Sequence, residues 1–121
     1  MVHSGIFATS SEILTCAGEN YDTGVTEAKI NELCLQAESV INAMSSFNWT
    51  DEWTAGLNAD VKYILSAAEA NWVAFHIIKF NTSGYASRLE AETMMDGCWD
   101  MFQECMKILK DKEYQTFIKE A

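Results

Sequence analysis

Residues 88–110 read RLEAETMMDGCWDMFQECMKILK and carry the clearest helical pattern in the chain. On a wheel of 100° per residue the apolar side chains gather on one side: Ala91, Met94, Met95, Cys98, Met101, Phe102, Cys105, Ile108 and Leu109. The acidic side chains gather opposite them: Glu92, Asp96, Asp100 and Glu104. This stretch predicts a long amphipathic helix with one buried face and one solvated face.

A second long helix is predicted from Thr26, a suitable N-cap, to Ser45 and Ser46, where the pattern fades. Its apolar positions recur at steps of three and four residues: Ile30, Leu33, Cys34, Ala37, Val40, Ile41 and Met44. Off this stripe lie Glu27, Glu32 and Glu38. We therefore expect one buried face and one face in water.

A third long helix is predicted from its cap at Asn58 to about Phe80. One apolar stripe consists of Val61, Ile64, Leu65, Ala68, Trp72 and Phe75. Much of the remaining circumference is covered by Tyr63, Ala67, Ala70, Val73, Ala74 and Ile77. A helix that is apolar nearly all round is either the central helix of a bundle or one that gives a face to a neighbouring subunit.

The connections have their own signals. Thr9 with Glu12 forms a capping box for a short N-terminal helix that Gly18 ends, and Ser87 with Glu90 forms a second box. Loops or turns are predicted at 19–25, 47–57 and 81–86. The last residues, 111–121, are either a helical turn packed on the bundle or a tail offered to a partner.

Together these patterns predict an all-α fold: a small helical bundle of three long helices with a short N-terminal helix and a C-terminal tail. The 121 residues suit a single domain, 1–121, made of 1–25, a bundle at 26–110 and a tail at 111–121. Apolar residues make up 49% of the chain, and it contains no proline to interrupt a helix.

The charge of the chain limits its partners. Eighteen acidic and eight basic side chains give a net charge of -10, which repels nucleic acid and anionic membranes. The start of the chain has no signal-peptide pattern, and no apolar run is long enough to span a membrane. We expect a protein that stays inside a cell and binds no membrane.

The sequence offers little catalytic equipment. The cysteines, Cys16, Cys34, Cys98 and Cys105, are interpreted as buried thiols, and no CxxC or HxxxH spacing suggests a metal site. His76 lies at the edge of an apolar stripe and is interpreted as a core or boundary histidine. We expect no enzymatic activity, no cofactor and no metal.

Three groups of residues are candidates for binding. The acidic set, Glu92, Asp96, Asp100 and Glu104, is either a solvated face or a deliberately negative surface such as a channel wall or a phosphate mimic. The candidate subunit interface consists of Tyr63, Ala67, Ala70, Val73, Ala74, Ile77, Trp49, Trp53 and Tyr85. The candidate docking tail consists of Tyr114, Gln115, Phe117 and Ile118.

From about Phe47 onward the chain resembles a known family, most of all at SGYASRLEAETMMD, residues 83–96, and KDKEYQTFI, residues 110–118. These segments resemble the head-to-tail connector, or adaptor, proteins of tailed bacteriophages. The resemblance implies a structural subunit of the phage neck, present in the virion and assembled in the host cytoplasm. It implies a homo-oligomeric ring, twelve-fold by family resemblance, between the portal protein and the next tail or neck protein.

In that assembly the acidic face would line the channel, DNA would pass as non-sticking cargo, and the tail would dock into the portal. Two alternatives remain. A monomeric acidic protein that mimics DNA would inhibit a basic partner. A small enzyme or ligand carrier would use the Met- and aromatic-rich interior as a pocket.

Overall fold

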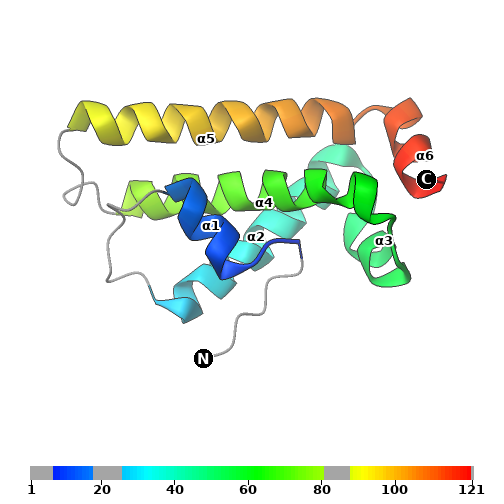
Figure 1. The fold of residues 1–121 in the computed structure, drawn as a ribbon, viewed down its shortest axis with the longest axis horizontal. Helices are drawn as coiled ribbons and strands as arrows, with labels where there is room; N and C mark the ends of the chain where they lie inside the picture. Colours follow the sequence, from blue (N-terminus) through cyan, green and yellow to red (C-terminus); the bar gives the residue numbers. More distant parts are fainter. Residues whose placement is uncertain (1–6, 18–25, 81–87, 121) are drawn as a thin grey trace.

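The computed structural model describes residues 7–17, 26–80 and 88–120 (Figure 1). All regular structure within these ranges is helical: α1 Ser10–Ala17, α2 Glu27–Ser45, α3 Trp49–Ala55, α4 Ala59–Phe80, α5 Arg88–Leu109 and α6 Lys112–Glu120. The predicted small all-α bundle is confirmed. Helix α3 lies where a connection was expected, and α6 bears out the helical turn packed on the bundle, one of the two alternatives for residues 111–121.

Helix α4 is the central helix of the bundle. It packs against α1, α2 and α5, and Figure 1 shows α5 running alongside it. The residues of α4 that are fully buried include positions from both of its predicted apolar sets: Leu65, Ala68, Val73, Ala74 and Ile77. Helix α4 is therefore apolar nearly all round because it is the central helix of the bundle, the first of the two explanations given above.

The predicted helix starts are confirmed where the structure describes them. The Thr9 hydroxyl accepts the Glu12 N–H at 3.2 Å, and the Glu12 carboxylate accepts the Thr9 N–H at 3.1 Å. Thr26 caps α2 by accepting the Lys29 N–H at 3.3 Å. Gly18, the loop at 19–25, the turn at 81–86 and the capping residue Ser87 lie outside the described residues.

The aromatic-rich connection at 47–57 contains a helix that the periodicity did not predict. Helix α3 begins after Asn48, whose side-chain oxygen accepts the Asp51 N–H at 3.1 Å. Trp49, in its first turn, is fully buried. A seven-residue helix is too short to show a periodic pattern, and packing of its tryptophan stabilises it instead.

Three side chains lie on the opposite side of their helix from the one predicted. Glu38 is buried because the buried face of α2 includes a polar seam of residues seven apart, Asn31, Glu38 and Ser45. Met44 and Met101, by contrast, are exposed, at 39% and 46%. Among the described residues, no helix is long and apolar enough to cross a membrane.

Candidate functional site

The last helix, α6, is fixed to the bundle by one polar and one apolar side chain. Gln115 and Ile118 are both buried. Nε2 of Gln115 donates hydrogen bonds to the carbonyl oxygens of Ser45, at 3.1 Å, and Leu109, at 2.7 Å. These are the last residues of α2 and α5, where helix carbonyls lack internal partners. Gln115 therefore ties α6 to the ends of two other helices.

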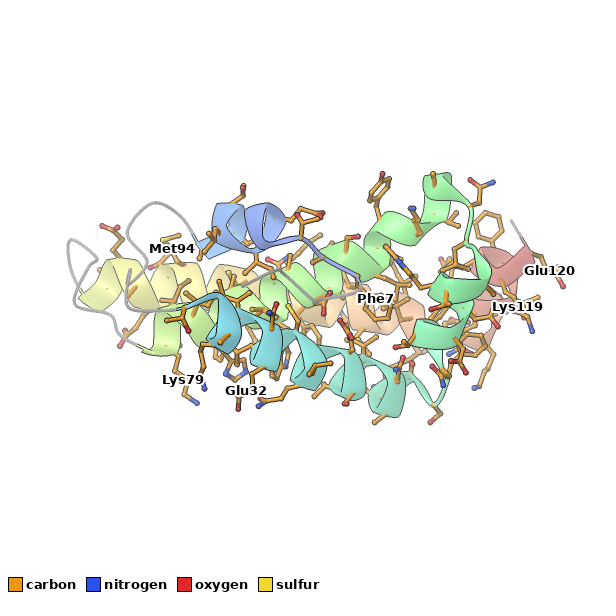
Figure 2. All side chains as sticks on the ribbon, turned by 90° about the horizontal axis from the view of Figure 1, so that it is seen from below. Phe7, Glu32, Lys79, Met94, Lys119 and Glu120 are labelled. Atoms are coloured by element: carbon orange, nitrogen blue, oxygen red, sulfur yellow. The ribbon has the colours of Figure 1, made fainter. Side chains whose placement is uncertain are left out.

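Two aromatic side chains of the same helix remain in solvent. Tyr114 is 52% exposed and Phe117 is 61% exposed. They are three residues apart and thus neighbours on one face of the helix. We call Tyr114 and Phe117 the α6 aromatic pair. Aromatic side chains are enriched in protein interfaces. Helix α6, which carries this pair, lies at the end of the molecule where Figure 2 labels Lys119 and Glu120.

The candidate docking tail is therefore corrected in half of its members. Gln115 and Ile118 do not face a partner, because α6 buries them against its own bundle. The amphipathic helix separates two anchoring residues from two exposed ones. The spacing in the sequence could have indicated two faces, since Gln115 and Ile118 are three residues apart and therefore lie on the same face of a helix.

An open hollow of about 470 Å³ lies at the corner where α2 meets α3. It is lined by Ser39, Asn42, Ala43, Ser46, Phe47 and Asn48. The Asn42 side chain spans this corner: its amide donates to the Thr50 hydroxyl at 2.9 Å, and its oxygen accepts the Trp49 N–H at 2.9 Å. Through these two bonds Asn42 fixes the corner between α2 and α3 that the hollow occupies.

The acidic side chains of α5 lie in solvent, as predicted. Glu92, Asp96, Asp100 and Glu104 are all exposed. Lys107 approaches the Glu104 carboxylate at 3.1 Å, but both side chains are exposed and such a pair stabilises the fold little. The use of this face as a channel wall stays a prediction.

Most of the candidate subunit interface belongs to the core of a single chain. Between 0% and 3% of each of five side chains is exposed, which corrects their assignment to an interface: Trp49, Ala70, Val73, Ala74 and Ile77. They are buried because α4 has neighbours on several sides. Ala67 and Trp53 are half-buried, and Tyr85 lies outside the described residues. Tyr63 alone of the described members is well exposed, at 62%.

The groups with potential for catalysis are in unreactive surroundings. His76 packs against Trp72, with ring centroids 4.1 Å apart, and its pKa is lowered by burial and by Lys79. Burial raises the pKa of the Cys98 and Cys105 thiols to about 11, with smaller contributions from Cys16 and Glu104 respectively. These thiols stay protonated at neutral pH, where a thiol is a weak nucleophile. Within the described residues no cluster of His, Cys, Asp or Glu could hold a metal ion.

A buried pair of acids, Glu38 of α2 and Glu69 of α4, was missed at the sequence level. Glu69 is fully buried and Glu38 is 5% exposed. Burial raises the pKa of Glu69 to about 10, helped by a hydrogen bond with Glu38 and by the charge of Glu38, and opposed by the N–H groups of Ala8 and Phe7. Glu69 is the one acid within the apolar run from 63 to 78, and this isolation was the available signal.

The N-terminal segment is fastened at the same place. The N–H of Ala8 donates to Oε2 of Glu69 at 2.5 Å, and the Ser66 hydroxyl donates to the carbonyl of Phe7 at 2.5 Å.

No protein family, no curated protein and no solved structure was found to match the chain.

Proposed function

We propose that this protein is a structural assembly subunit without enzymatic activity, and that it binds a neighbouring protein through the α6 aromatic pair. The observation that carries the proposal is the division of α6 into a buried anchoring side and an exposed aromatic side. In its specific form the proposal is a ring subunit of a tailed-phage neck. The resemblance of residues 83–96 and 110–118 to connector proteins supports that form.

The α6 aromatic pair is suited to docking on energetic grounds. Full burial of one large apolar side chain contributes roughly 1.5–3 kcal/mol. Tyr114 and Phe117 are already more than half in water, so a partner can cover them without unfolding the bundle. The hydrogen bonds of Gln115 hold the helix beneath them, which reduces the entropy lost when a partner binds.

The first test removes the aromatic pair. We expect Tyr114→Ala with Phe117→Ala to weaken binding to the portal protein encoded in the same genome by roughly 30-fold or more, because the buried apolar area is lost. Surface plasmon resonance with immobilised portal measures the change. The matched control is Leu35→Ala, which removes an equally exposed side chain, 58%, from α2. Equal binding by the double variant and the wild type would contradict the proposal.

A second candidate function is a DNA mimic, and the exposed row of acids on α5 favours it. Asp96→Asn with Asp100→Asn distinguishes the two. A mimic would lose its basic partner, with steep dependence on salt, whereas a ring subunit should assemble unchanged. We expect unchanged assembly and a stability within a few tenths of a kcal/mol of wild type, because repulsion between acids four residues apart is relieved. Size-exclusion chromatography with portal and thermal melting measure the two quantities.

A further inference from the structure

The open hollow at the corner of α2 and α3 has the features of a second binding site. Its volume of about 470 Å³ lies within the range of roughly 300–1,000 Å³ that is usual for ligand sites. Because the hollow is open to solvent, it does not enclose a free small molecule. It suits a side chain inserted by a partner protein, since the surface of the partner then closes the opening and excludes water.

The hollow lies beside the base of α6. Ser46, which lines the hollow, follows Ser45, whose carbonyl oxygen accepts the hydrogen bond from Gln115 of α6 at 3.1 Å. Figure 1 shows α3 and α6 at the same end of the molecule. A partner that covers the α6 aromatic pair is therefore close to the hollow as well.

The charges around the hollow favour a cation. Residues 30–61, which include most of α2 and all of α3, contain five acidic side chains and no Lys, Arg or His. The side-chain nitrogen of Asn48, a lining residue, donates to Oδ2 of Asp51 at 3.0 Å, which places this exposed carboxylate at the rim. Within the described ranges no Lys or Arg forms an ion pair with Asp51. The C-terminal end of α2 adds the negative end of its helix dipole.

The lining of the hollow fits a planar guanidinium group better than a compact ammonium group. The half-buried ring of Phe47 is held against Trp49, with ring centroids 4.4 Å apart, and Arg stacks on aromatic rings more readily than Lys does. The hydroxyl groups of Ser39 and Ser46 add acceptors to the Asp51 carboxylate. Ser46 has a φ of 54°, a position where helix ends usually carry glycine, so the hydroxyl is present despite an unfavourable backbone conformation.

We propose that the hollow binds an arginine side chain of the partner protein, with the guanidinium group between the Asp51 carboxylate and the Phe47 ring. This inference rests on the proposed function, because the arginine belongs to the same partner that covers the α6 aromatic pair. It adds the chemistry of that partner: a surface with an apolar area for Tyr114 and Phe117 and an arginine beside it.

NMR titration of the full chain with N-acetylarginine amide tests the site without the partner. We expect saturable shifts of the Ala43, Ser46 and Asn48 amides, and none with N-acetylcitrulline amide, which has a similar shape and no charge. The amides of Asp96 and Asp100 report general attraction to an acidic surface and should not saturate. Equal shifts with the citrulline compound, or saturation at Asp96 and Asp100 with none at the hollow, would overturn the proposal.

Three variants locate the site. Asp51→Asn should weaken binding of the arginine compound roughly threefold or more, because the charge pair is lost. Ala43→Leu fills the hollow from an exposed helix position and should abolish the shifts, while leucine keeps α2 helical. The control, Glu32→Gln, removes an exposed acid of α2 about 10 Å along the helix from Ser39 and should bind as the wild type does. Unchanged binding by both Asp51→Asn and Ala43→Leu would contradict the site.

Surface plasmon resonance with the portal protein separates this inference from the proposed function. If the chain binds portal through Tyr114 and Phe117 but the arginine compound does not bind at the hollow, only the inference is wrong. If the compound binds at the hollow and the chain does not bind portal, the proposed partner is wrong while the hollow is still a guanidinium site.

Discussion

At the scale of single residues, buried polar side chains were the hardest feature to predict. The capping residues Thr9 and Thr26 act as expected, because capping depends on local spacing alone. The burial of Glu38 depends on how α2 turns its polar seam towards α4, and no local pattern specifies that rotation. The unusual position of Glu69 could have been predicted, since an isolated acid in an apolar helix is either buried or at a boundary.

The buried acid pair leads to a prediction about thermal stability. At pH 8 we expect Glu69→Gln to raise the melting temperature by roughly 3–8 °C, because an amide needs no proton to occupy this site. The difference should shrink as the pH falls towards 4.5, where the Glu69 carboxyl begins to hold its proton in the unfolded chain as well. Circular dichroism melts at several pH values measure it, with Glu32→Gln as the control. A variant less stable than the wild type at pH 8 would contradict this account of the pair.

At the scale of elements, the long helices and the short helix α1 were predictable, α6 was one of two alternatives, and α3 was not predicted. Helices α2, α4 and α5 each repeat their apolar pattern over about five turns or more, which fixes both their extent and most of their buried positions. Helices α3 and α6 depend on tertiary contacts of one or two side chains, Trp49 in α3 and Gln115 with Ile118 in α6. The bond from Gln115 to Ser45 joins residues 70 positions apart, which no local pattern indicates.

The attachment of α6 can be tested through Gln115. We expect Gln115→Ala to destabilise the docked helix by roughly 1–3 kcal/mol, because the carbonyls of Ser45 and Leu109 lose their donor. Hydrogen exchange should increase along α6 and remain unchanged in α4. The control is Thr116→Ala, whose exposed hydroxyl bonds only within the helix, to Lys112 at 3.0 Å. Unchanged exchange in α6 would mean that Gln115 is not its anchor.

At the scale of the whole molecule, the bundle covers more of its apolar surface than the sequence suggested. The composition of α4 allowed a face for another subunit as one of two explanations, but α1, α2 and α5 cover most of this helix. Composition alone cannot distinguish a central helix from an interface helix, since both are apolar all round. What remains outside in the candidate sites is Tyr63, the α6 aromatic pair and the acidic face of α5.

The assembly hypothesis therefore depends on the α6 end more than on α4. Native mass spectrometry of the protein mixed with the portal protein of its own genome tests it most directly. We predict a complex that contains a ring of this chain matching the portal in symmetry, and its loss when Tyr114 and Phe117 are both replaced by alanine. A protein that stays monomeric and leaves the portal mass unchanged would contradict the account.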